Sequence, residues 1–135
     1  MSRTRGLAAA AGCAFGCLLL AGCASGPATQ DAFEAHLRDA IRNASSAEGA
    51  AFEGAVGSAF REPRIRDRLR ACQRADASAA QLRGTLDFLG TGAYSVDLRP
   101  RGPASDCVSR AIAAEHLPEP PRYPFSIPFR WPDRL

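Results

Sequence analysis

The chain has 135 residues, which is enough for one small domain together with a targeting segment. Its formal net charge is +3, and all 17 basic residues are arginine. Arg3 and Arg5 belong to an N-terminal segment with the character of a secretion signal, so the rest of the chain carries 15 arginines against 14 acidic residues. Nucleic-acid binding requires a strongly basic face. This near balance therefore argues against a nucleic-acid partner.

Residues 1–22 are predicted to be a signal peptide. Two arginines precede an apolar run from Leu7 to Leu20, and small residues follow it. This order is typical of secretory signals. The run is shorter than the roughly 20 residues that a membrane-spanning helix needs, which disfavours the alternative of a short membrane anchor.

The residues from Leu20 to Cys23 read Leu-Ala-Gly-Cys and resemble the lipobox of bacterial lipoproteins. The resemblance implies cleavage before Cys23, a diacylglyceryl thioether on its sulfur and acylation of the new amine. Each buried methylene contributes about 0.8 kcal/mol, so several acyl chains hold a protein on a membrane almost permanently. Ala24 stands where an aspartate retains enterobacterial lipoproteins in the inner membrane. We therefore expect an outer-membrane anchor facing the periplasm, with the lipid as the only attached group.

The lipidated tether is predicted over residues 23–30, which are small and polar. A helical segment follows over residues 31–61. Its apolar residues recur at helical spacing in two stripes and predict two helices. The first stripe is Phe33, Leu37, Ala40, Ile41 and Ala44, and the second is Phe52, Ala55, Val56, Ala59 and Phe60. Pro63 suits the first turn of a third helix over roughly 64–75.

From Leu82 the apolar period changes to two, and Leu82–Phe88 and Tyr94–Leu98 predict two half-buried strands. Gly90-Thr91-Gly92 joins them as a hairpin turn. Ser105 or Asp106 can cap a following helix. That helix would face the core with Val108, Ala111, Ile112 and Leu117 and end at the proline-rich residues 118–121.

A last strand is predicted from the alternation of Phe125, Ile127 and Phe129, with Trp131 on the same inner face. Pro124 and Pro128 lack amide donors, so this strand suits the edge of a sheet. The sequence therefore predicts an α+β fold. N-terminal helices precede a small β-β-α-β unit over residues 62–135 with a three-stranded antiparallel sheet.

Five cysteines are present, but Cys13 and Cys17 lie in the predicted signal and Cys23 carries the lipid. Cys72 and Cys107 remain, and a disulfide between them would close a loop of 36 residues. Such a loop contributes roughly 4 kcal/mol in the chain-entropy model, and the periplasm permits the bond. The alternative is a redox or metal pair. Without a CxxC motif, and with two histidines at most, we expect no metal site.

No catalytic motif is found, and we expect no enzyme activity. His36 is predicted to be solvated and His116 to lie at a helix end. The charged residues of the hairpin are expected to form cross-strand ion pairs, and they are Arg83, Asp87, Asp97 and Arg99. A run of arginines at 64, 66, 68, 70 and 74 is typical of a solvated helix face, with a contact to peptidoglycan or anionic lipid as the weaker alternative.

The C-terminal half resembles the TonB and TolA C-terminal domains, in particular their AgmX/PglI-type variant, over about residues 62–132. The residues that carry the resemblance are Cys72, Gly84-Thr85-Leu86-Asp87-Phe88, Gly92, Asp106-Cys107-Val108, Leu117-Pro118, Pro120-Pro121, Phe125, Ile127 and Phe129. The resemblance implies a non-catalytic periplasmic domain that binds other envelope proteins. Members of this group often recruit a partner strand at a sheet edge, and either edge is open to this role.

The sequence therefore predicts an outer-membrane lipoprotein that acts as an interaction module of the cell envelope. We expect an envelope protein as its partner and no small-molecule substrate. Two alternatives remain. One is a cell-wall-associated enzyme or enzyme inhibitor, and the other is a purely structural lipoprotein without a dedicated partner.

Overall fold

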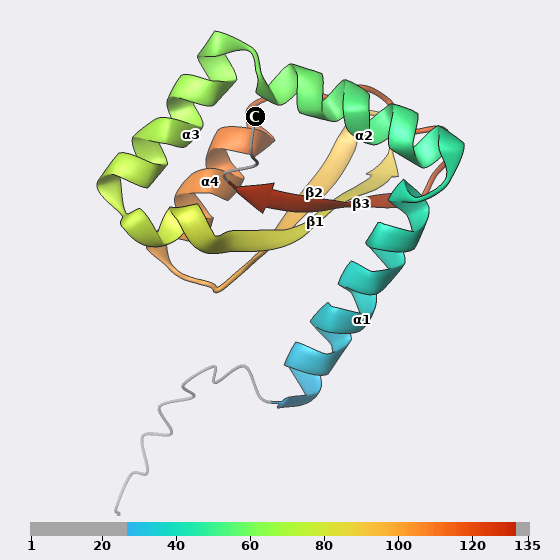
Figure 1. The fold of residues 1–135 in the computed structure, drawn as a ribbon, viewed down its shortest axis with the longest axis horizontal. Helices are drawn as coiled ribbons and strands as arrows, with labels where there is room; N and C mark the ends of the chain where they lie inside the picture. The colour runs from blue at the N-terminus through green and yellow to red at the C-terminus, as the bar shows by residue number, and fades with distance from the viewer. Residues whose placement is uncertain (1–26, 132–135) are drawn as a thin grey trace, which may run out of the picture.

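The computed structural model describes residues 27–131, and the predicted signal peptide and Cys23 lie outside them. Helix α1 spans Pro27–Ala44, α2 spans Ala47–Phe60 and α3 spans Pro63–Ala75. A short 3-10 helix, η1 (Ala77–Gln81), leads into strands β1 (Leu82–Gly90) and β2 (Ala93–Arg99). Helix α4 (Pro103–Ala113) and strand β3 (Phe125–Trp131) complete the fold (Figure 1).

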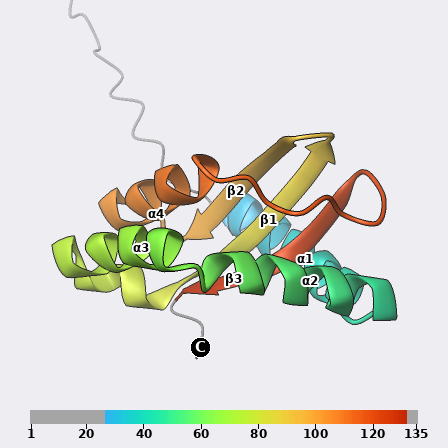
Figure 2. The same ribbon diagram turned by 90° about the horizontal axis from the view of Figure 1, so that it is seen from above.

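The three strands form one antiparallel sheet in the order β2-β1-β3. The predicted α+β class and the three-stranded antiparallel sheet are therefore confirmed. Helices α3 and α4 lie side by side at one end of the sheet, and the β1–β2 hairpin extends away from them (Figure 2). Strands β2 and β3 are the two edges.

One face of the sheet forms the main core with α2, α3 and α4. The inward residues of β3 are the predicted Phe125, Ile127, Phe129 and Trp131, and all four are buried. The ring of Phe52 on α2 meets those of Phe88 and Phe125 edge to face, at centroid distances of 5.0 and 5.7 Å. Aromatic pairs favour this geometry. The rings thus fix α2 against β1 and β3.

Helix α1 covers the opposite face of the sheet. The sequence predicts this helix but does not predict that it packs there. Phe33, Leu37, Ala40 and Ala44 are buried against this face. Thr85, on the side of β1 expected to face solvent, has no exposed surface. Its hydroxyl donates to Asp87 at 2.9 Å. The expectation of half-buried strands is therefore wrong for β1, because a helix some fifty residues earlier in the chain occupies its second face.

Several predicted boundaries change in the structure. Helix α1 begins at Pro27, so residues 27–30 of the predicted tether form its first turn; the fixed φ of proline suits that position. Ile41 is 43 % exposed and does not face inward. Helix α4 begins at Pro103, two residues before the expected cap at Ser105. Ser105 instead lies in its first turn, where its hydroxyl accepts from the Gly102 N–H at 2.9 Å.

Two glycines are required by the backbone of the hairpin. Gly92 has a φ of +69°, which side chains disfavour, and it allows the tight turn between β1 and β2. Gly84 lies in β1 opposite Leu98. A Cβ atom at Gly84 would lie 1.8 Å from the carbonyl oxygen of Asp97. The close approach of β2 to β1 therefore excludes any side chain at this position.

Candidate protein-binding edge of the sheet

Strand β3 is an edge of the sheet, and the direction of its backbone groups follows from two observations. In an antiparallel ladder the N–H and C=O of one residue point to the same side, and the side alternates along the strand. The carbonyl of Ser126 accepts a hydrogen bond from the Asn43 side-chain amide of α1 at 3.1 Å. Pro128, two residues on, has no N–H to give to β1. Ser126, Pro128 and Arg130 therefore direct their backbone groups away from β1.

The chain itself covers the beginning of this edge. Asn43 is at the end of α1, and α2 begins at Ala47 on the opposite face of the sheet. The short connection therefore passes around the edge near Ser126, where Asn43 occupies the outward carbonyl. The outward groups that follow are the carbonyl of Pro128 and the N–H and carbonyl of Arg130. Within residues 27–131, no other strand pairs with this edge, so the second half of β3 offers main-chain hydrogen bonds to another strand.

A groove runs beside this half of the edge, between α2 and β3. It has a volume of about 170 Å³ and is walled mainly by apolar side chains. Val56, Gly57 and Phe60 line it from α2, and residues 127–131 line it from β3. The side chain of Trp131 lies at the C-terminal end of the strand. Its indole N–H is buried and has no hydrogen-bond partner among the described residues.

The predicted cysteine pair is brought together at the other end of the domain. The sulfur atoms of Cys72 on α3 and Cys107 on α4 lie 2.01 Å apart, and their Cα atoms 5.8 Å apart. The disulfide joins two helices whose inner faces are in the main core. The two cysteines are 35 positions apart in the sequence. Cys23, the predicted lipidation site, lies outside the described residues.

The ion pairs of the hairpin differ from those predicted. Arg83 lies opposite Arg99 on β2, and Asp87 lies opposite Ser95, so the register aligns no opposite charges. Arg83 instead pairs with Glu34 of α1 at 2.5 Å. Asp87 contacts His36 of α1 at 2.6 Å. The cross-strand expectation is wrong, because α1 supplies the partners of Arg83 and Asp87, and Asp97 pairs with Arg99 on its own strand at 2.9 Å. His36 remains exposed, as predicted, while it contacts Asp87.

The arginine run of α3 also has an unforeseen partner. Glu115 follows the end of α4, and its side chain is only 1 % exposed. Arg64 and Arg68, one helical turn apart, bind its two carboxylate oxygens at 2.5 and 2.6 Å. Both arginines remain exposed, as predicted for a solvated face, but they also share a buried carboxylate that the sequence did not predict. Their spacing of four residues was a signal for a shared partner, but only the tertiary structure identifies it.

The same corner of the fold holds Tyr94 of β2. Its hydroxyl oxygen lies 2.7 Å from the carbonyl of Ile112, in the last turn of α4, and 2.8 Å from that of Glu115, just beyond the helix. Such carbonyls have no partner within the helix itself. Burial raises the pKa of the Tyr94 phenol, and the negative charge of Glu115 adds to this. The protonated hydroxyl therefore serves as a hydrogen-bond donor at the end of the helix.

The two histidines lie in different parts of the fold. His36 contacts Asp87 of β1, and His116 is exposed in the segment that follows α4. Within residues 27–131, no three His, Cys, Asp or Glu side chains come together in a group that could hold a metal ion. No helix of this part of the chain is long and apolar enough to cross a membrane.

Comparisons with protein-family models, with curated proteins and with solved structures find no match to this chain. The function must therefore be argued from the residues and from the geometry of the fold. The features that bear on it are the open half of the β3 edge and the groove beside it.

Proposed function

We propose that this protein is a lipid-anchored interaction module of the bacterial envelope, and that it binds an extended segment of a partner protein along the second half of β3. The anchor is Cys23, on the outer membrane and facing the periplasm. The module performs no catalysis. Its partner is an envelope protein with an accessible strand-forming segment.

The observation that carries this proposal is the coincidence of the open backbone edge with the apolar groove. A strand that adds to a sheet gains affinity from main-chain hydrogen bonds and specificity from pockets that take alternate side chains. Arg130 offers an outward N–H and C=O, and the groove lined by Val56, Phe60 and Phe129 lies directly alongside. A bound segment would direct every second side chain into this groove.

Two further points support the proposal. The order β-β-α-β, with the third strand at an edge, agrees with what the resemblance to TonB and TolA C-terminal domains implies. Trp131 presents a buried indole N–H without a partner among residues 27–131. Leaving such a donor unpaired is costly, and a carbonyl of a bound segment could satisfy it.

The sharpest test removes one backbone donor. Arg130→Pro deletes the outward N–H at the open edge, and the ladder to β1 should survive because Pro128 is tolerated in the same orientation. Arg130→Ala is the matched control, since it removes the side chain and keeps the N–H. Photo-crosslinking from a neighbouring edge position in intact cells, followed by mass spectrometry, reads out partner capture.

We expect one reproducible envelope protein to be crosslinked by the wild type and by Arg130→Ala. Arg130→Pro should lose this product while retaining the thermal stability of the wild type. Equal crosslinking by all three proteins would rule out pairing at this edge. A partner captured only from probes on β2, whose outer edge is also unpaired, would move the binding site to the other side of the sheet.

A further inference from the structure

Four arginines gather at one end of the sheet, on the face that α1 covers. Arg83 of β1 lies directly opposite Arg99 of β2 and Arg130 of β3, so the three form a row across the sheet. Arg101 follows just after β2. Like charges that face each other across strands are destabilising. Anionic groups close to the row would therefore stabilise it.

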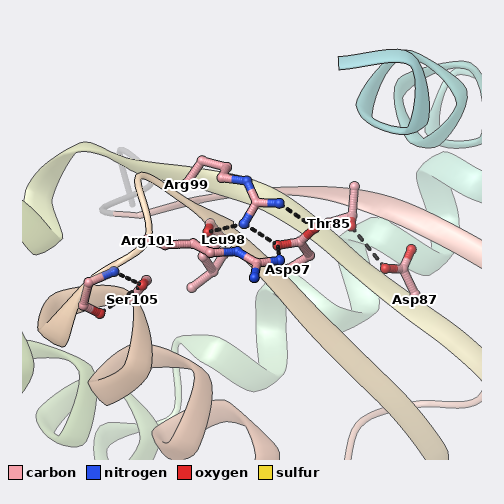
Figure 3. Close-up of polar contacts among 8 residues, drawn as sticks. Thr85, Asp87, Asp97, Leu98, Arg99, Arg101 and Ser105 are labelled. Atoms are coloured by element: carbon pink, nitrogen blue, oxygen red, sulfur yellow. Dashed lines mark hydrogen bonds and ion pairs between the residues drawn. The ribbon is translucent and has the colours of Figure 1, made fainter. Parts of the chain in front are cut away.

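The carboxylates of the protein neutralise only part of this positive charge. Glu34 pairs with Arg83. Asp97 lies 2.9 Å from Arg99 and 3.5 Å from Arg101 (Figure 3). Arg130 has no ion-pair partner within residues 27–131. Two paired carboxylates thus accompany four guanidinium groups, and a local excess of positive charge remains.

Three of these arginines line a hollow on the surface. The arginine hollow is lined by Gln30, Gln81, Arg83, Arg99, Pro100 and Arg101, and its volume is about 360 Å³. It contains guanidinium and amide donors, and among the residues that the structure describes no acidic side chain lines it. Arginine binds phosphate oxygens through paired N–H groups. The lining therefore fits a phosphate-bearing anion.

The position of the hollow on the chain indicates where that anion comes from. Gln30 is in the first turn of α1, which begins at Pro27. Only residues 24–26 separate Pro27 from Cys23, and four fully extended residues span at most about 14 Å. A lipid on Cys23 therefore holds this end of the domain at the bilayer surface.

We propose that the arginine hollow binds the phosphate of an anionic phospholipid headgroup and orients the domain on the membrane. The proposal rests on the lipid anchor of the proposed function. With the hollow against the headgroups, the domain is held at the N-terminal end of α1. The open half of β3 and its groove can then meet a partner at a defined height above the bilayer.

The test uses the full chain in a nonionic detergent, so the same sample serves whether or not Cys23 carries lipid. It is titrated with soluble dihexanoyl phosphatidylglycerol, with dihexanoyl phosphatidylcholine and with inorganic phosphate. NMR follows the side-chain amides of Gln30 and Gln81. Arg83→Gln/Arg101→Gln removes two charges from the hollow, and Arg70→Gln/Arg74→Gln removes two exposed charges from α3 as the matched control.

We expect saturable shifts with phosphatidylglycerol only. Each surface arginine contributes about fivefold in affinity for anionic lipid, so the hollow variant should bind more than tenfold more weakly and the control variant within about twofold of the wild type. Arg101→Gln alone, with an exposed side chain, should weaken binding by about fivefold if the double variant fails to fold.

Three results would overturn the proposal. They are equal binding of phosphatidylcholine, equal loss in both double variants, and binding of inorganic phosphate as tight as that of phosphatidylglycerol, which would make the hollow a site for free anions. The anchor is checked separately by the mass of the N-terminal peptide. If Cys23 carried no lipid and the hollow still bound phosphatidylglycerol, the proposed function would be contradicted and the headgroup site would be supported.

Discussion

At the scale of single residues, Glu115 is the charged side chain most enclosed by its surroundings. It is almost fully buried, and two arginines from α3 bind its carboxylate. These arginines remain 66 % and 45 % exposed, so water still solvates the positive side of the cluster. The pairing therefore links the end of α4 to the beginning of α3 without burying all three charges.

Replacing this carboxylate should destabilise the domain. Glu115→Ala removes a buried charged acceptor, and we expect the free energy of unfolding to fall by about 2 kcal/mol, because two charge-assisted hydrogen bonds are lost while the arginines can still be hydrated. Urea denaturation measures the effect. Asp39→Ala, which removes the exposed pair with Arg42, is the control and should change stability by less than about 0.5 kcal/mol.

Tyr94 should make the domain sensitive to alkaline pH. Its pKa is raised in the folded protein, whereas in the unfolded chain the phenol ionises at its usual value of about 10. Above that pH the folded state binds more protons than the unfolded state, so the free energy of unfolding should decrease as pH rises through the folded pKa. Unfolding measured between pH 8 and 11 should show this decrease, and Tyr94→Phe should flatten it.

At the scale of elements, helices α3 and α4 are joined at both ends of their contact. The disulfide between Cys72 and Cys107 lies at one end. The pairing of Arg64 and Arg68 with Glu115 lies at the other. The two helices therefore act as one antiparallel unit under the sheet, which explains how so small a core holds its shape.

Loss of the disulfide should weaken this unit more than any single ion pair. Reduction, or Cys72→Ser/Cys107→Ser, is expected to lower the free energy of unfolding by about 4 kcal/mol, since the unfolded chain regains the freedom of a 36-residue loop. Urea denaturation with and without a reductant measures the effect. The double serine variant should not respond to the reductant. An unchanged midpoint on reduction of the wild type would contradict a structural bond.

Helix α1 decides how the second face of the sheet is used. Glu34 and His36 contact Arg83 and Asp87, and Asn43 bonds to the carbonyl of Ser126. One helix thus connects the end of the chain nearest Cys23 to both the arginine row and the edge of β3. Both proposed binding surfaces therefore contact the same helix.

At the scale of the whole molecule, the fold consists of three stacked layers: α1, the sheet, and the group of α2, α3 and α4 (Figures 1 and 2). The layers place the arginine hollow beside the beginning of α1. The open half of β3 lies at the sheet edge between α1 and α2. This arrangement suits a domain held to a membrane at one side and open to a protein partner at its edge.

The anchor itself can be tested by a single substitution. Cys23→Ser removes the sulfur that would carry the diacylglyceryl group, so the chain should retain residues 1–22 and lack acyl chains. Mass spectrometry of the N-terminal peptide from the wild type and the variant measures both. A variant that is processed and acylated like the wild type would refute the lipoprotein assignment.

Local patterns in the sequence determined the helices, the hairpin, the buried aromatic face of β3 and the α+β class. Periodicity, glycine turns and proline positions act within a few residues, and so they can be interpreted without a partner. The pairing of Cys72 with Cys107 could also be inferred, because these two cysteines are the ones left for the domain once the predicted signal and the predicted lipidation site at Cys23 are set apart. The missing amide donor of Pro128 indicated that its strand lies at a sheet edge, which the structure confirms.

Only the tertiary structure decided what the charged residues do and which faces are covered. His36 and Asp87, and likewise Arg68 and Glu115, are roughly fifty positions apart in the sequence and meet only in the folded chain. The burial of Thr85 also depends on a distant element, helix α1. No short-range pattern encodes them, since a polar side chain in a helix or strand looks the same whether water or another element faces it. The arginine row likewise exists only once the register of β2, β1 and β3 is set.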